Sequence, residues 1–290
     1  MKNFSLMIAT PALFFILIMQ VYFPMPIAEG EAHLHDEVEF IYLPFLARQR
    51  SKFDQMIFIP AGEFKMGCDQ DNAYEHCFVH ELPLHAVYLD DYYIDINLVT
   101  NHEYRECVLA NVCPPPESPT SRTRISYHYD PIYANYPVVW VYWEAAETYC
   151  NWLGKRLPSE AEWEKAARGT DNGVFPWGDE WIDCTLANYH AGTDGYCVGD
   201  TTEVGSYPLG ASFYGALDMA GNVYEWVSDW YQDDYYSVSA YNNPTGPETG
   251  STKVLRGGSF GSSDIFNRTA WRRTCYSSSY AYGFRCAATP

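Results

Sequence analysis

Nine cysteines constrain the fold of this chain more than any other feature. Six of them stand close together in three pairs: Cys68 with Cys77, Cys107 with Cys113, and Cys184 with Cys197. The sequence contains no C-x-x-C pair, the spacing that is typical of structural zinc sites. In an exported chain, so many cysteines indicate disulfides rather than metal binding. We therefore expect three local disulfides.

The first residues have the composition of an export signal. Lys2 gives a positive start, residues 13–19 form an apolar run, and residues 26–28 (Pro-Ile-Ala) precede the first acidic residue as a cleavage site would. An uncleaved membrane anchor is the alternative, but a glutamine and two prolines interrupt the run before the length that spans a bilayer. We expect a signal peptide at residues 1–28, a linker or N-terminal arm at 29–54, and an exported product that is secreted, periplasmic or attached to the cell surface.

The charge of the chain limits its partners. Asp and Glu number 37 and Lys and Arg number 18, so the formal net charge is −19. An acidic surface of this kind repels nucleic acid and anionic membranes. We therefore expect no nucleic-acid partner, and contact with a membrane only through the signal segment if it stays uncleaved.

Short elements follow one another through residues 55–290. Apolar runs at 56–59 and 85–89 predict strands, and Pro60-Ala61-Gly62 predicts a turn. Residues 143–153 have apolar positions at helical spacing, and Gly154 ends that helix. Two capping boxes, one at Thr100 and one at Ser159, each predict the start of a helix. Without an internal repeat or a change in composition, we expect a single α+β domain.

Several motifs stand in a fixed order along this domain. They are the strand and turn at 56–64, Val-Thr-Asn at 99–101, and the segments 155–164, 175–178, 218–226, 256–260 (Arg-Gly-Gly-Ser-Phe) and 283–286 (Gly-Phe-Arg-Cys). Together they resemble the formylglycine-generating enzyme family, also called sulfatase-modifying factors. The resemblance implies that family's irregular, C-type-lectin-like fold, with short strands, few helices and long loops. It also implies a disulfide between Cys150 and Cys286, which leaves Cys275 over.

The resemblance implies a structural calcium site in the segment 218–226. Calcium binds hard oxygens of carboxylates and backbone carbonyls. Asp218 and Glu225 offer carboxylates, and Gly221 and Val223 can offer carbonyls. On spacing alone, the two acidic residues would serve equally well to cap turns.

A second calcium site is expected at Asn188 and Asp194, with the carbonyls of Tyr189 and Tyr196. The loop that carries these residues is shorter than in catalytic members of the family. The expected disulfide of Cys184 and Cys197 brackets the loop and would take over part of the metal's structural role.

The family's active position carries different chemistry in this chain. Catalytic members have a cysteine pair there that binds copper, whereas here the resemblance implies Ser259, Gly261 and Ser262, with Asp264 or Asn267 opposite. Soft Cu(I) needs thiolate ligands, which hydroxyl, amide and carboxylate groups do not replace. We therefore expect neither copper nor copper-dependent oxidation.

The segment from 262 to 282 is rich in Ser, Tyr, Asn and Arg and lacks apolar periodicity. This mixture is typical of adaptable binding loops, and a merely solvated loop is the alternative. Arg268, Arg272 and Arg285 match family positions and are expected to brace the loop through backbone carbonyls. Cys275 is either a reactive thiol or a buried or paired one.

Three hypotheses for the function follow. The first is an exported, calcium- and disulfide-stabilised module of this fold without the copper oxidase activity, whose surface around Ser259–Tyr282 binds a protein, peptide or glycan. The second is a divergent oxidase or modifying enzyme that acts on a protein or a secreted metabolite, with Cys275 or an unseen cofactor carrying the chemistry. The third is a passive structural module of a cell-surface assembly.

Overall fold

The structure is a computed structural model that describes residues 53–290. The predicted signal segment and all but the last two residues of the predicted N-terminal arm lie outside the described residues. Within residues 53–290, none of the helices has the length and apolar character needed to cross a membrane.

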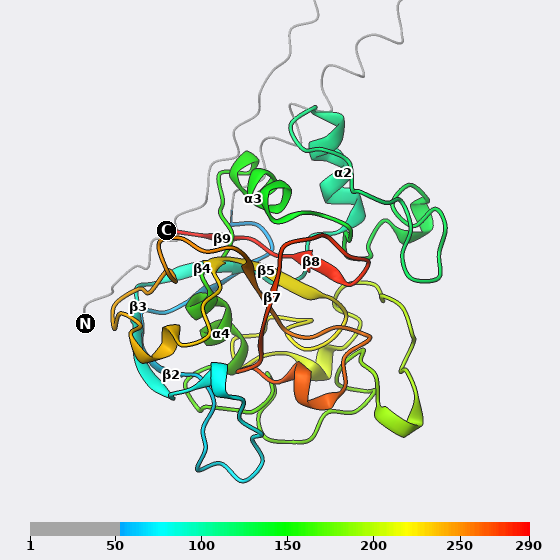
Figure 1. The fold of residues 1–290 in the computed structure, drawn as a ribbon. Coiled ribbons are helices and arrows are strands. Elements are labelled where there is room, and N and C mark those ends of the chain that lie inside the picture. Colours follow the sequence, from blue (N-terminus) through cyan, green and yellow to red (C-terminus); the bar gives the residue numbers. More distant parts are fainter. Residues whose placement is uncertain (1–52) are drawn as a thin grey trace, which may run out of the picture. The chain divides into compact units, whose positions relative to one another are not determined.

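Short strands and few helices make up the described part of the chain (Figure 1). The helices are α2 (Asn101–Leu109), α3 (Trp143–Trp152) and α4 (Glu160–Arg168). The strands are β1 (Met56–Ile59), β2 (Gly62–Met66), β3 (His85–Leu89), β4 (Tyr92–Asp95), β5 (Tyr224–Trp230), β6 (Lys253–Arg256), β7 (Arg272–Cys275), β8 (Tyr282–Phe284) and β9 (Ala287–Ala288). Single 3₁₀ turns and long loops join them, so the predicted irregular α+β fold is confirmed.

The strands form three small sheets. β1, β4 and β9 make one antiparallel sheet, and β2 pairs with β3 in a second. The third has the order β7-β6-β5-β8, in which β5 and β8 run parallel and the other pairs are antiparallel. This third sheet carries both the Asp218–Glu225 segment and the Arg-Gly-Gly-Ser-Phe turn at its strand ends.

Local capping starts two of the three helices where the sequence predicts. The Thr100 hydroxyl accepts the Glu103 N–H at 3.2 Å, and the Glu103 carboxylate accepts the Thr100 N–H at 2.9 Å. Ser159 and Glu162 make the same reciprocal pair at the start of α4. Both predicted capping boxes are therefore confirmed, and each satisfies N–H groups that the first helical turn leaves unpaired.

The structure contains all four expected disulfides. They join Cys68 to Cys77, Cys107 to Cys113, Cys150 to Cys286, and Cys184 to Cys197. The third connects α3 to the segment between β8 and β9 across 136 residues of sequence. Cys275 is the one free cysteine in the described part of the chain.

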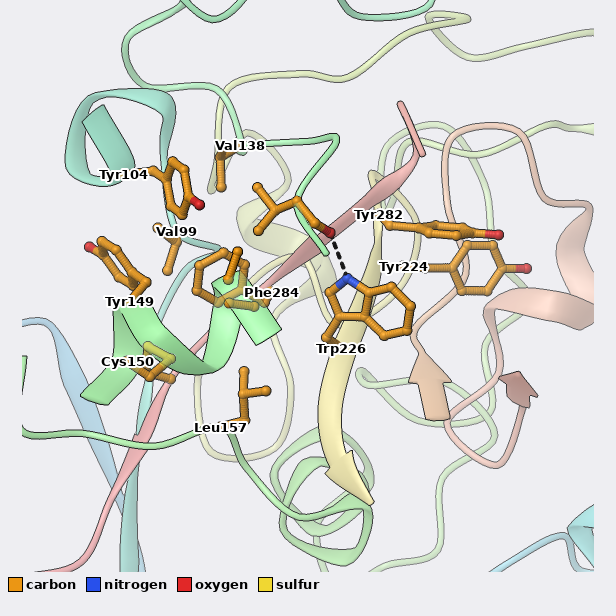
Figure 2. Close-up of a cluster of buried hydrophobic side chains, with 14 of the residues drawn as sticks. Val99, Tyr104, Val138, Tyr149, Cys150, Leu157, Tyr224, Trp226, Tyr282 and Phe284 are labelled. Carbon is orange, nitrogen blue, oxygen red and sulfur yellow. Dashed lines mark hydrogen bonds between the residues drawn. A yellow bond between two sulfur atoms is a disulfide. The ribbon is translucent and has the colours of Figure 1, made fainter. Parts of the chain in front are cut away.

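Aromatic side chains of β5 and β8 fill the core beside α3 (Figure 2). Trp226 and Phe284 are at most 1% exposed, and the Trp226 indole N–H donates to the Val141 carbonyl at 3.0 Å. The rings of Tyr224 and Tyr282 meet edge to face, and Figure 2 shows both hydroxyl groups pointing away from Trp226. The core therefore presents two phenol groups to the region beyond the sheet.

Buried arginines brace the C-terminal third of the domain. Arg268, Arg272 and Arg285 donate to backbone carbonyls, as predicted, and their carbonyl partners include Ile265, His80, Gln232, Asp95, Ile96 and Leu217. The sequence did not predict that each also binds a buried glutamate of a distant segment. The pairs are Arg268 with Glu81, Arg272 with Glu160, and Arg285 with Glu225, and Arg256 similarly binds Glu164.

Candidate functional site

A cavity of about 240 Å³ lies where β5, β7 and β8 meet the turn that follows β6. Six separate segments contribute its lining: Arg122, Tyr196, Tyr224, Ser259, Phe260, Gly261, Ser262, Arg273, Ser279, Tyr280, Ala281 and Tyr282. The two phenol groups that point away from the core in Figure 2 are therefore part of its wall. The cavity includes three of the residues predicted at the active position.

Hydrogen-bonded hydroxyl groups form the floor of the cavity. The Ser259 and Ser262 hydroxyl oxygens lie 3.1 Å apart, and the Ser262 hydroxyl donates to the Tyr224 hydroxyl at 3.0 Å. All three side chains are buried, with exposed fractions of 3 to 7%. The chain of hydroxyls fixes the orientation of each group and leaves oxygen lone pairs and O–H protons for a bound polar molecule.

Two glycines make the turn that carries these serines. Gly257 and Gly258 both have positive φ, at 86° and 74°. A Cβ on Gly258 would lie 2.2 Å from Oδ1 of Asn267, and one on Gly257 would lie 3.0 Å from the Trp163 ring. The turn therefore needs glycine both for its backbone conformation and for space.

The structure separates the other two predicted residues from the cavity. Asn267 is buried, and its Nδ2 donates to the carbonyls of Ser263 at 2.8 Å and Ser262 at 3.4 Å. The Asp264 carboxylate accepts the N–H of Ile265. Neither side chain lines the cavity. The position where the resemblance implies a thiolate pair is therefore built from hydroxyl and amide groups.

Cys275 lies next to the cavity without lining it. Its half-buried thiol contacts Ser277 at 3.5 Å and interacts with Tyr282, which does line the cavity. Burial alone would raise the pKa of this thiol, but the hydrogen bonds from Ser277 and Tyr282 outweigh burial and lower the pKa. Cys275 is thus an accessible thiol with one tyrosine between it and the cavity.

The rim of the cavity consists of two residues from the predicted binding segment 262–282, Arg273 and Tyr280, and two from outside it, Arg122 and Tyr196. Arg122 and Arg273 are exposed, and Tyr196 and Tyr280 are 43% and 39% exposed. Arg122 comes from the loop after α2 and Arg273 from β7, so nothing in the local sequence connects them. Tyr196 was considered only for its carbonyl oxygen. The composition of residues 262–282 had indicated a binding loop that includes Arg273 and Tyr280, whereas only the high tyrosine content, 25 residues, pointed to Tyr196.

The segment proposed for calcium has one carboxylate that suits a cation and one that is already paired. Asp218 is buried, its Oδ2 accepts the Gly205 N–H at 2.7 Å, and burial raises its pKa to about 6. The Glu225 carboxylate binds the Arg285 guanidinium through both oxygens, at 2.6 and 2.9 Å. A calcium ion here would offset the buried charge of Asp218 and would share Glu225 with the arginine.

The residues predicted for the second calcium site, Asn188, Tyr189, Asp194 and Tyr196, do not form one coherent set of ligands. Asn188 is buried, and its Oδ1 has no hydrogen-bond partner within residues 53–290, so this oxygen would fit a cation ligand. Asp194, however, is exposed in a 3₁₀ turn, and the Tyr189 carbonyl already accepts the Cys197 N–H at 3.0 Å. The Asn188 carbonyl accepts the Asn222 N–H at 2.8 Å, which connects Asn188 to the first set instead.

Carboxylates do not gather elsewhere into an obvious metal site. Among the described residues there is no group of three or more His, Cys, Asp or Glu side chains that could hold a metal ion. A calcium ion bound at Asp218 would therefore depend on backbone carbonyls for several of its ligands. The donor set around Asp218 and Glu225 fits such an ion, and the set around Asp194 fits it less well.

Comparisons with known proteins agree on one family. Residues 44–290 match the family described as "Sulfatase-modifying factor enzyme 1-like domain". The chain is 40% identical over 248 residues to serine/threonine-protein kinase Pkn1 of Chlamydia trachomatis, covering 80% of this chain and 38% of that protein. It is 35% identical over 293 residues to the formylglycine-generating enzyme of Streptomyces coelicolor, covering 83% of this chain and 91% of the enzyme.

A solved structure supports the same conclusion. The structure of PvdO from Pseudomonas aeruginosa superposes with a TM-score of 0.68 at 30% identity, covering 81% of this chain and 94% of PvdO. The chain spans only 38% of the length of the chlamydial kinase, so the kinase as a whole says little about it. The similarity to the bacterial enzyme and to PvdO covers nearly the full length of both.

Proposed function

The chain belongs to the sulfatase-modifying factor family, and from this premise we propose that it is an exported ligand-binding module of that family without copper-dependent oxidation of cysteine. The ligand, a protein, peptide or glycan group, would occupy the cavity beside β5 and β7. Four disulfides support the proposed export, because such bonds persist in oxidising compartments.

One observation carries the proposal. Hydroxyl groups of Ser259 and Ser262 occupy the floor of the cavity, and the amide of Asn267 is turned into its own loop. Cu(I) prefers thiolates, and the one free thiol of residues 53–290 stands behind Tyr282. A single thiol of this kind does not replace a pair. The cavity is therefore suited to hold a polar molecule and lacks the ligands for a copper redox centre.

The oxidation assay tests this proposal directly. The purified full chain is incubated with Cu(I), oxygen and a C-x-P-x-R peptide, and the peptide is analysed by mass spectrometry for formylglycine. The Streptomyces coelicolor enzyme serves as the positive control. We expect no conversion by this chain. Conversion would refute the proposal, and its loss in a Cys275→Ser variant would favour the divergent enzyme instead.

The divergent enzyme remains the second candidate because of one contact. The Cys275 thiol, whose pKa is lowered, interacts with the Tyr282 side chain that forms part of the cavity wall.

We further propose that a structural calcium ion binds at Asp218 and Glu225, with the carbonyls of Gly221 and Val223. The buried carboxyl of Asp218 supports this, because burial raises its pKa to about 6 and a divalent cation would offset that cost. The proposal is confined to this set, since Asp194 is exposed and the Tyr189 carbonyl is already engaged.

Thermal unfolding with and without calcium tests the proposed calcium site. At a calcium concentration about 100 times the dissociation constant, binding adds roughly 2.7 kcal/mol, or about 5–10 °C in Tm for a domain of this size. We expect this increase over an EGTA-treated sample for the wild type and for the control Asp264→Asn, and its loss in Asp218→Asn. Equal melting temperatures with calcium and with EGTA would refute the site.

A further inference from the structure

The cavity differs in charge from the rest of the chain. The formal net charge is −19, yet the twelve described residues that line the cavity include two arginines and no aspartate or glutamate. Local positive charge in a strongly acidic protein requires an explanation, because the chain as a whole has 37 Asp and Glu residues against 18 Lys and Arg. The lining of the cavity excludes the acidic residues.

Neither arginine has an acidic partner. The ion pairs formed within residues 53–290 involve Arg256, Arg268 and other cations, but not Arg122 or Arg273. The contrast with the buried arginines is direct, since Arg268 meets Glu81 at 2.8 Å. The two guanidinium groups on the cavity rim therefore keep their full charge.

Aromatic rings hold both guanidinium groups in place. Arg122 lies over the Tyr196 ring at 4.3 Å and donates to the Gly199 carbonyl at 2.8 Å. Arg273 lies over the Tyr224 ring at 5.3 Å and over the Tyr282 ring at 5.9 Å. Stacking uses the face of a guanidinium group and leaves N–H groups at its edge for a planar oxyanion. The pair is thus positioned in advance for a negatively charged group.

The remaining lining suits a hydroxylated molecule. The Ser259, Ser262 and Tyr224 hydroxyls of the floor both donate and accept hydrogen bonds, which matches the hydroxyl groups of a sugar. The partly exposed ring of Tyr280 offers an apolar surface at the rim. The cavity volume of about 240 Å³ is enough for a small polar head group.

We propose that this cavity binds an acidic sugar, with its carboxylate, sulfate or phosphate group between Arg122 and Arg273 and its hydroxyl groups against Ser259 and Ser262. The inference rests on the ligand-binding function proposed above and names the chemical class of the ligand. An acidic peptide side chain shares the oxyanion but lacks the hydroxyl groups that the floor would bind. The sugar is therefore the occupant that uses the whole lining.

Isothermal titration calorimetry on the purified full chain tests the ligand class. The probes are glucuronate, glucose 6-sulfate, glucose 6-phosphate, uncharged glucose, and N-acetylaspartate as an acid without sugar hydroxyls. We expect at least one acidic sugar to bind about tenfold or more tightly than glucose and N-acetylaspartate, and to bind more weakly as NaCl is added. Binding of glucose with equal affinity, or binding of none of the acidic sugars, would overturn the proposal. Equal binding of N-acetylaspartate would also overturn it in favour of an acidic peptide.

Two variants test the residues. Arg122→Gln and Arg273→Gln should each weaken binding of the acidic sugar by about tenfold or more, because each removes a charge-assisted hydrogen bond. Lys65→Gln is the matched control, since it removes the same charge from the exposed face of β2 and should bind as the wild type does. Unchanged melting temperatures establish that all three variants fold. Wild-type affinity in both arginine variants would refute the assignment.

The oxidation assay separates this inference from the proposed function. A chain that oxidises the C-x-P-x-R peptide refutes the proposed function, whatever the sugars do. A chain that neither oxidises the peptide nor binds an acidic sugar refutes only the ligand class.

Discussion

The long-range disulfide offers the sharpest test of what holds this domain together. Cys150–Cys286 and Cys107–Cys113 belong to the same core cluster, and all four sulfur atoms come from side chains that are at most 5% exposed. Replacing either pair by alanines therefore removes similar buried volume from similar surroundings. The two disulfides differ mainly in the sequence they enclose, which is 136 residues for one and 6 for the other.

The chain-entropy model converts this difference into free energy. A loop entropy of roughly 2.1 + 1.5R ln n cal/mol/K gives about 5 kcal/mol for the long loop and about 2 kcal/mol for the short one at 25 °C. The variant Cys150→Ala/Cys286→Ala should therefore lose about 3 kcal/mol more unfolding free energy than Cys107→Ala/Cys113→Ala. For a domain of this size the difference amounts to about 6–12 °C in Tm.

Urea unfolding of both double variants and the wild type, at one calcium concentration, measures the difference. The slope of the unfolding free energy against urea concentration must also be compared, because removal of a long crosslink lets the unfolded chain expand. Equal losses for the two variants would refute the entropic reasoning and would mean that packing around the sulfur atoms sets the stability.

Three further perturbations follow from single residues. Burial raises the pKa of Asp229 from 3.8 to about 7. The stability that its proton contributes is therefore present below about pH 4 and is lost as the pH rises through 7. In urea unfolding between about pH 4 and 8, Asp229→Asn should flatten this loss, and the control Asp71→Asn should not. Gly258→Ala should cost about 2–4 kcal/mol because it combines positive φ with a 2.2 Å clash, whereas Gly261→Ala, with no heavy atom nearer than 3.9 Å, should cost under about 1 kcal/mol. Iodoacetamide should label one thiol in the native protein and none in Cys275→Ser, as mass spectrometry will report. Identical pH slopes, equal glycine costs, or an unlabelled native protein would each contradict the corresponding reasoning.

Local signals account for most of what the sequence predicts correctly. The capping boxes at Thr100 and Ser159 need only residues three positions apart, and both helices begin there. The three short disulfides join cysteines that lie near one another in sequence, so chain connectivity alone brings them together. The fourth required the family resemblance, because 136 residues separate Cys150 from Cys286.

The candidate site was predicted in part. The family resemblance of the Arg-Gly-Gly-Ser-Phe motif located Ser259 and Ser262, and both residues line the cavity. The arginines of the rim could not be found in this way. Arg122 lies in the loop after α2 and Arg273 in β7, and only the folded chain brings both of them to the same cavity. Their proposed role in binding an anion depends on the absence of an acidic partner among the described residues, and no local sequence pattern predicts that absence.

The buried ion pairs were missed for a related reason. Arg268 and Arg272 were expected to contact carbonyls, and they do. Their glutamate partners, Glu81 and Glu160, lie 187 and 112 residues away. A buried charge needs a partner of opposite sign, but the sequence offers 37 acidic candidates and no rule for choosing among them.

The pairing of β9 with β4 has a consequence for the timing of folding. Tyr93 and Ile94 of β4 find their partners in Ala288 and Ala287, so that edge of the first sheet stays open while almost all of the remaining chain is made. Cys150 likewise waits for Cys286. The domain therefore cannot close until residues 286–288 have been made, and the thiol of Cys150 has to wait for its partner until that point.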